Sequence, residues 1–174
     1  MDLAGILRAA VLAALVLPVS AAAQSAAPNC AAPVAPTGVL APWTSPVAAT
    51  AAESSSAART APLAVGEAAR VTLLPNPQVS FAAPPERPGD AASFGGVFTL
   101  TVAEPGTYRV ALGAGAWIDL VRGGEVIAST AHGHGPECTG IRKMVDFPLE
   151  AGTHIVQIAA SPVAETTVLA VRLP

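Results

Sequence analysis

Short runs in which apolar and polar residues alternate, separated by turn residues, fill the chain from Pro62 to its end. Runs of this kind that recur about every 8 to 12 residues are typical of an all-β sandwich or barrel. The pattern predicts strands over residues 69–74, 79–81, 94–102, 107–112, 117–122, 125–130, 143–149, 153–159 and 166–173. We therefore predict an all-β fold, an antiparallel, jelly-roll-like β-sandwich.

Two local patterns refine this prediction. Gly123 and Gly124 separate two of the predicted strands, and a glycine pair tolerates the positive φ at both positions that a two-residue hairpin turn requires. Residues 104–112 also resemble residues 150–158, because each segment has a glutamate, then Gly-Thr, then an alternating run. In this alignment His154 takes the position of Tyr108, so we expect His154 to pack as a strand residue.

The N-terminal third of the chain has a different character. Residues 1–23 combine a short apolar block with an Ala-x-Ala ending, which predicts a secretory signal peptide. Residues 24–61 are rich in Ala, Pro and Ser and predict a loosely held arm, in which Trp43 is expected to insert into a neighbouring core. Residues 62–174 then form the β-sandwich domain. We expect a periplasmic or secreted protein with no transmembrane segment after signal removal.

The charge and the cysteine content indicate the cellular compartment and limit the classes of partner. The formal net charge is −3, and only Arg142 and Lys143 place two cations together, so no basic patch favours nucleic acid. Cys30 and Cys138 are the only cysteines, and an even number in an exported chain predicts a disulfide. The disulfide would fasten the arm to the domain. The expected partner is a small molecule, a glycan or a protein.

The segment 131–140 gathers the residues that are best suited to bind a metal. His132 and His134 are two apart, so at the end of an extended strand their side chains point the same way, and Glu137 follows closely. With His154 they form a candidate ligand set for iron, zinc or copper. Cys138 could join it only as a free thiolate, which competes with the disulfide. The alternative is that this glycine-rich loop is structural or a metal-free recognition surface, with no cofactor.

A second candidate surface lies on the strand predicted at 117–122. Trp117 and Asp119 share one face of that strand and, with Arg142, could line a sugar-binding surface through stacking and a carboxylate. The alternative is that Trp117 covers the sheet and that Asp119 pairs with Arg142 or Lys143. The sequence contains no Gly-x-Ser-x-Gly motif and no phosphate-binding glycine loop before a helix, which disfavours hydrolase and nucleotide functions.

Two resemblances to known proteins follow from these motifs. The strand that leads into Gly106-Thr107-Tyr108, with the later repeat at Gly152-Thr153, resembles the β-sandwich modules exported by bacteria, of which the pre-peptidase C-terminal domain is the familiar type. The resemblance covers residues 94–173 and implies an accessory or binding role, in some members toward carbohydrate or a neighbouring catalytic domain.

The second resemblance rests on the segments GAWIDLV (115–121), STAHGHGP (129–136) and IRKMVDF (141–147). They are similar to short exported proteobacterial proteins that carry the name homogentisate 1,2-dioxygenase. Enzymes of that name are longer cupin-type proteins with a non-haem iron held by two histidines and a glutamate. The resemblance implies an iron site made by His132, His134 and Glu137 or His154.

Two functions of different class are therefore expected. The first is an exported binding or structural module without catalytic residues. The alternative is a metal-binding or dioxygenase-like protein that uses the histidine loop.

Overall fold

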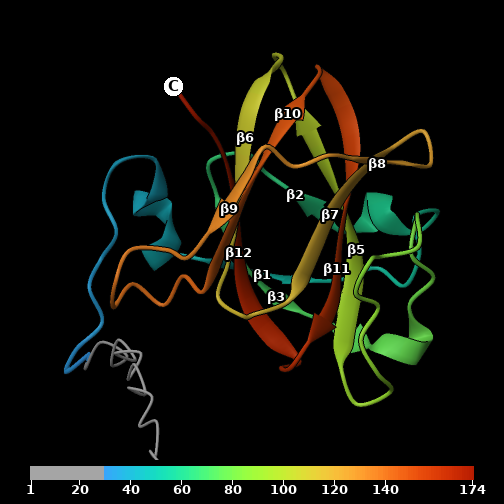
Figure 1. Ribbon diagram of the computed structural model, residues 1–174, viewed down its shortest axis with the longest axis horizontal. Coiled ribbons are helices and arrows are strands. Elements are labelled where there is room, and N and C mark those ends of the chain that lie inside the picture. Colours follow the sequence, from blue (N-terminus) through green and yellow to red (C-terminus); the bar gives the residue numbers. More distant parts are fainter. Residues whose placement is uncertain (1–29) are drawn as a thin grey trace, which may run out of the picture.

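In a computed structural model, residues 30–174 of the chain form two facing β-sheets (Figure 1). The predicted signal peptide, residues 1–23, lies outside the described residues. Sheet A has the order β1-β3-β12-β6-β10-β9 and sheet B the order β2-β5-β11-β7-β8, with β4 paired to β5. The predicted all-β sandwich is confirmed.

The strands of sheet A are β1 (Val47–Thr50), β3 (Ala68–Thr72), β6 (Gly106–Leu112), β9 (Ala131–Gly133), β10 (Lys143–Leu149) and β12 (Glu165–Arg172). Those of sheet B are β2 (Pro62–Leu63), β4 (Leu74–Pro75), β5 (Phe94–Val102), β7 (Trp117–Arg122), β8 (Glu125–Ile127) and β11 (Gly152–Ser161). Three short 3₁₀ helices, η1 (Gly38–Thr44), η2 (Ala58–Thr60) and η3 (Asn76–Gln78), complete the described elements. No helix among residues 30–174 is long and apolar enough to cross a membrane.

The central strands are paired antiparallel, as predicted, and the two parallel pairs, β1 with β3 and β2 with β5, lie at the edges. Strands begin and end at the predicted residues at 94–102, 117–122 and 143–149. The strand predicted at 79–81 is absent, because Pro75 and Pro77 favour the 3₁₀ turn of η3 and leave only an isolated bridge at Ser80. The hairpin turn at Gly123 and Gly124 is confirmed, with φ of 62° and 87°.

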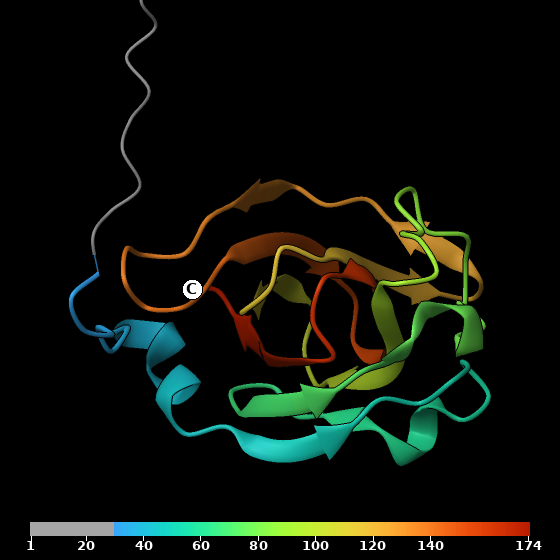
Figure 2. The same cartoon turned by 90° about the horizontal axis from the view of Figure 1, so that it is seen from below.

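The main core lies between the two sheets, and Figure 2 shows the strands curling around it. Alternation of side chains along each strand directs one set inward. The largest inward side chains are fully buried: Phe98, Leu100, Leu112, Leu120, Phe147, Leu149 and Ile158. Aliphatic and alanine side chains supply most of the remaining contacts, so this core contains few aromatic rings.

A smaller apolar cluster covers the outer face of sheet A. Leu40 and Trp43 of η1 pack there against Leu169 and Val171 of β12, and Trp43 is only 9% exposed. Trp43 thus inserts into a core, as expected from the sequence. Residues 47–50, which belong to the segment predicted as an arm, form the edge strand β1.

The predicted disulfide is present between Cys30 and Cys138. Beside it, the Val34 N–H donates to the Cys138 carbonyl over 2.8 Å. The start of the described chain is therefore attached to the loop that follows β9, both covalently and through the backbone.

The two segments that resemble each other in sequence also form the same local structure. The Tyr108 hydroxyl donates to the Glu104 carbonyl over 2.8 Å, and His154 Nε2 lies 2.8 Å from the Glu150 carbonyl. Since a carbonyl only accepts, Nε2 carries the proton in that bond. His154 is 1% exposed, and its Nδ1 is buried without a hydrogen-bond partner. Each ring closes a turn back onto the preceding chain, as in the tyrosine corner of β-sandwiches.

Breaking the disulfide is expected to destabilise the fold strongly. Its cysteines are 108 residues apart, and the chain-entropy treatment gives roughly 4 to 5 kcal/mol for a closed loop of about that length. Urea unfolding of the wild type, with and without reductant, and of the Cys30→Ser/Cys138→Ser double variant measures this. The reduced wild type and the double variant should agree, and an unchanged midpoint would contradict the expectation.

The two corner hydrogen bonds are expected to differ in their contribution to stability. Tyr108→Phe leaves the Glu104 carbonyl without its partner and should cost about 1 kcal/mol. His154→Phe should cost less, because it removes the unpartnered Nδ1 together with the hydrogen bond to Glu150. Equilibrium urea unfolding of both variants compares them, and a larger loss for His154→Phe would contradict this account.

Candidate functional site

The histidine loop connects the edge strand β9 to β10. His132 pairs in register with Val145 and is exposed. His134 is also exposed, and its Nδ1 lies 2.9 Å from the Arg142 carbonyl. Both histidines therefore lie on the outer rim of sheet A.

The remainder of the loop folds tightly on itself. The Gly135 N–H donates to the Ile141 carbonyl, and a Cβ at Gly135 would overlap the Ile141 side chain. The Thr139 hydroxyl donates to the Pro136 carbonyl over 2.7 Å, which closes a turn around the exposed Glu137 and the disulfide-bonded Cys138. Gly135 and Pro136 thus serve a structural role in this connection.

The predicted metal ligands do not form a coordination sphere in this arrangement. His154 is buried between the sheets, with Nε2 engaged by the Glu150 carbonyl, and Cys138 is held in the disulfide. Within the described chain, no three His, Cys, Asp or Glu side chains lie close enough together to hold a metal ion. In this arrangement the residues therefore do not form the two-histidine and one-carboxylate iron centre implied by the second resemblance.

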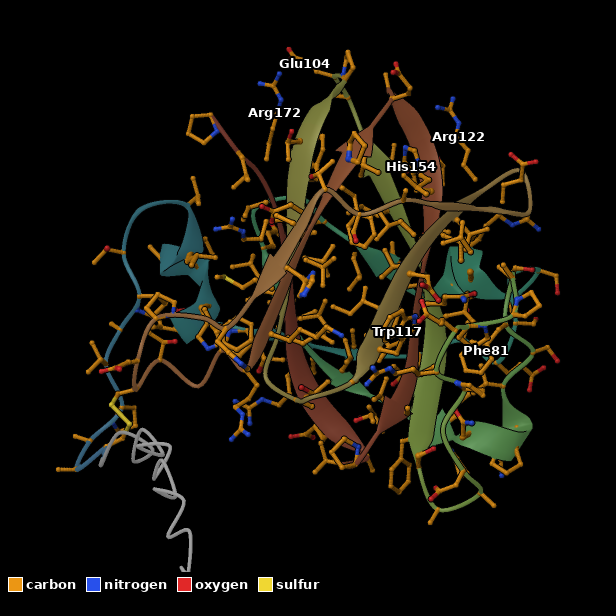
Figure 3. The ribbon with its side chains drawn as sticks, viewed as in Figure 1. Phe81, Glu104, Trp117, Arg122, His154 and Arg172 are labelled. Carbon is orange, nitrogen blue, oxygen red and sulfur yellow. A yellow bond between two sulfur atoms is a disulfide. The ribbon has the colours of Figure 1, made fainter. Side chains whose placement is uncertain are left out.

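The second candidate surface is more fully built. Trp117 and Asp119 lie on the outer face of sheet B, because the intervening Ile118 and the following Leu120 point into the core. The Trp117 Nε1–H donates to Asp119 Oδ1 over 2.8 Å. Figure 3 shows Trp117 near one end of β7 and Arg122 toward the other. The indole is half-buried, and its orientation is fixed by the carboxylate of Asp119.

Gln157 on the neighbouring strand β11 completes this support. Its Nε2 donates to Asp119 Oδ2 and to the Ala83 carbonyl, both over 2.9 Å. Its Oε1 accepts the N–H groups of Ala82 and Ala83 over 3.0 and 3.2 Å. One fully buried amide therefore joins the carboxylate below Trp117 to the loop that crosses sheet B. Asp119, at 6% exposure, has both oxygens engaged and serves as a support for the indole.

Two cationic groups lie against the Trp117 ring. Lys143 Nζ is 4.8 Å and Arg87 Cζ is 5.5 Å from the ring centroid, within the range of cation–π attraction. Lys143 Nζ also donates to the Ala116 carbonyl over 2.9 Å. Burial lowers the pKa of Lys143, the nearby Arg87 lowers it further, and Asp119 opposes the shift. We call Trp117, Asp119, Gln157, Lys143 and Arg87 the Trp117 cluster.

The cluster contains two of the three surface residues predicted from the sequence. Trp117 and Asp119 lie together, whereas the Arg142 side chain is exposed and makes no ion pair with any residue in the range 30–174. Its neighbour Lys143 takes the place next to the ring. Lys143 is the only lysine of the chain, and this feature of the sequence could have identified it as a candidate site residue. No comparable feature of the sequence identifies Gln157 or Arg87 as site residues. Gln157 is a polar residue in an apolar strand, and Arg87 lies in a proline-rich loop.

Loss of the Asp119 carboxylate is expected to destabilise the protein. Asp119→Leu leaves the Trp117 Nε1–H and one Gln157 N–H without their acceptor, which should cost about 2 to 3 kcal/mol. Adding Gln157→Leu should cost less than the sum of the two single losses, because the variants share one network. Urea unfolding of the single and double variants tests this, and strict additivity would show that the network is not coupled.

The histidine loop is expected to bind no metal at stoichiometric level. Elemental analysis of iron, zinc and copper in protein purified with its disulfide intact is the measurement. The His132→Ala/His134→Ala variant is the matched control. One equivalent of metal in the wild type that disappears in the variant would contradict the placement described above.

No known protein family and no curated protein matches this chain. The two resemblances noted in the sequence therefore stay predictions.

Proposed function

We propose that this protein is an exported, non-catalytic binding module whose ligand surface is the Trp117 cluster. The observation that carries the proposal is the convergence of Lys143 and Arg87 on one half-buried indole. Burial is the largest cause of the lowered pKa of Lys143, and the positive charge of Arg87, which repels the Lys143 ammonium, lowers it further. A ligand that brings negative charge would relieve the repulsion.

The local charges favour an anionic ligand. Lys143 and Arg87 contribute two positive charges, and Asp119 contributes the single buried negative charge beside them, with both oxygens already bonded. The cations thus keep a net attraction for an incoming carboxylate or phosphate. The apolar edge of Trp117 offers contact to the remainder of the ligand. We therefore propose an acidic glycan or a similar carboxylate-bearing molecule.

Preorganisation supports a binding role. The indole is oriented by Asp119, which is oriented by Gln157, which is bonded to the backbone of Ala82 and Ala83. A ligand would therefore meet a surface whose side chains are already ordered, which lowers the entropic cost of association.

Export is the proposed context for this role. The Cys30–Cys138 disulfide agrees with an oxidising compartment. The signal-like segment 1–23 favours the periplasm or the exterior of the cell.

The test uses the single lysine as a reporter. In protein labelled with ¹³C at lysine Cε, Lys143 gives the only lysine signal, and glucuronate should shift it whereas glucose, which lacks the carboxylate, should not. Lys143→Gln should abolish glucuronate binding measured by calorimetry, and Arg87→Gln should weaken it about threefold to tenfold. Arg142→Gln is the matched control, because Arg142 is the adjacent cation outside the cluster. Equal responses to both sugars would overturn the proposed ligand class.

The pH dependence of the reporter gives a second prediction. In the free protein the pKa of Lys143 lies below its ordinary value because of burial and Arg87. A bound carboxylate stabilises the ammonium, so the pKa should rise when glucuronate binds, and binding should weaken as the pH rises through the pKa of the complex. A pH titration of the Cε signal with and without glucuronate measures both effects. An unchanged or lowered pKa in the complex would exclude contact between the carboxylate and Lys143.

A further inference from the structure

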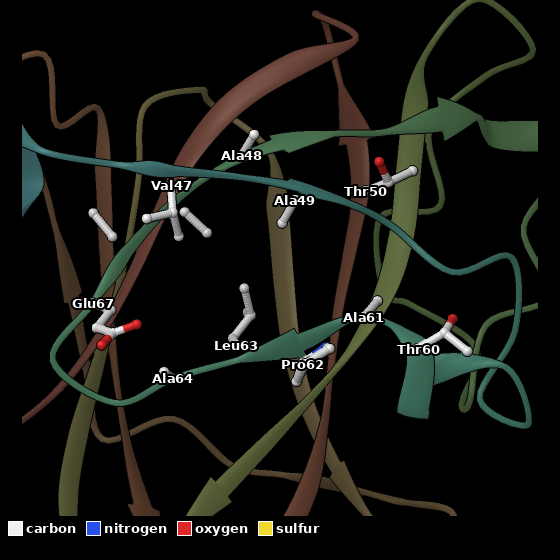
Figure 4. A pocket seen from close by; sticks show the side chains of 12 residues that line it. Val47, Ala48, Ala49, Thr50, Thr60, Ala61, Pro62, Leu63, Ala64 and Glu67 are labelled. Carbon is white, nitrogen blue, oxygen red and sulfur yellow. The ribbon is translucent and has the colours of Figure 1, made fainter.

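A cavity of about 380 Å³ lies between the edge strands β1 and β2 (Figure 4). In sheet B, β2 is at the edge opposite to β8. Ala49 of β1 and Leu63 of β2 line it, together with Ala61 and Ala68. The turn at 64–67, where Gly66 has φ of 83°, bounds one end. At the other end the chain leaves β1 and crosses to sheet B, where Ala52 bridges Val97.

The backbone of β1 is open toward this cavity. The Ala51 N–H donates to the Thr72 carbonyl over 2.9 Å, so alternate residues of β1, which include Ala49, direct their N–H and C=O groups to β3. The groups of Ala48 and Thr50 therefore point to the opposite edge, where no strand of the described chain pairs with β1. These two residues present two donors and two acceptors along one edge.

The facing edge of β2 cannot satisfy these groups. The Thr99 N–H donates to the Ala61 carbonyl, so Ala61 and Leu63 direct their backbone groups to β5, and Pro62 faces the cavity without an N–H. The Ala64 carbonyl already accepts the Glu67 N–H. An added strand would therefore pair with β1 and lie over β2.

The edge of β1 also lacks the usual protection against strand pairing. Exposed edges are commonly blocked by charged side chains, proline or a bulge. Strand β8 carries Glu125 and β2 carries Pro62, whereas β1 reads Val-Ala-Ala-Thr, with Val47 at 58% exposure. An uncharged, extended edge of this kind is suited to β-strand addition, in which the main chain of a peptide supplies affinity and alternate side chains enter a pocket.

We propose that the β1 edge binds a short extended peptide of a partner protein by strand addition. The cavity is walled by alanines above Leu63, so it accepts small or medium aliphatic side chains at alternate positions of the peptide. Glu67 is the one charged residue among those that line the cavity, and it is exposed at the end formed by the 64–67 turn. We expect a lysine or arginine of the peptide to lie next to Glu67. This site is separate from the Trp117 cluster, because β5 and β11 lie between β2 and β7 in sheet B.

The test uses acetylated and amidated pentapeptides of alternating valine and threonine, with a lysine at the first position in one peptide and at the last position in the other. One of them should shift the backbone amide signals of Ala48 and Thr50 in ¹⁵N NMR spectra and slow their hydrogen exchange. The same peptide N-methylated at the residues that pair with β1 should bind about tenfold more weakly or not at all. Equal binding of the N-methylated peptide would overturn strand addition.

Three variants of the protein sharpen the test, one of them as a control. Thr50→Pro removes an N–H from the open edge without touching the bonds to β3, and it should weaken peptide binding about tenfold. Val126→Pro, in the middle of β8 at an edge of sheet B, is the matched control and should leave binding unchanged. Glu67→Gln should weaken the lysine peptide about threefold and leave a glutamine-substituted peptide unaffected. Unaltered affinity in Thr50→Pro would contradict the proposal. A second result would also contradict the proposal: the protein binds neither peptide but forms concentration-dependent dimers, and Thr50→Pro abolishes these dimers. The occupant of the β1 edge would then be a second copy of this chain.

Discussion

The period-two alternation of β11 is the constraint on which both the core and the Trp117 cluster depend. This strand is bonded to β5 on one side and to β7 on the other. One set of its side chains, which includes His154, Val156 and Ile158, packs between the sheets. Because successive side chains point to opposite faces, Gln157 is directed to the outer surface of sheet B. A shift of one residue in register would bury Ile155 in place of Val156 and remove Gln157 from Asp119.

The hydrogen bonds of Gln157 on the outer face of sheet B matter for stability because this side chain is buried. Gln157 is fully buried although it lies outside the main core, because the loop containing Ala82 and Ala83 covers it. A buried amide without partners would cost free energy, and here each of its polar atoms has a partner. The network therefore holds the loop to sheet B and orients the indole of Trp117 with the same set of bonds. Stability and the proposed binding surface are coupled through one side chain.

Much of the fold could be predicted from the sequence, and the exceptions have physical reasons. Long alternating runs such as 94–102 and 143–149 coincide with strands, because a strand with one buried face must alternate. The edge strands β1 and β9 are too short and too exposed to leave such a pattern. The sequence predicts the Cys30–Cys138 disulfide because the chain contains two cysteines, so each has one possible partner. Arg87 could not be foreseen, since its position next to Trp117 depends on how a proline-rich loop folds over a distant strand.

The two proposed binding surfaces differ in the physical interaction on which they rely, and this difference makes them separable. The Trp117 cluster attracts its ligand through Lys143 and Arg87, an electrostatic contribution that added salt weakens. The β1 edge relies on main-chain hydrogen bonds and contact with small apolar side chains, which salt affects little. In sheet B the strands β5 and β11 separate β2 from β7, so one ligand does not exclude the other by overlap. A module of this design could hold a charged molecule and an extended protein segment at the same time.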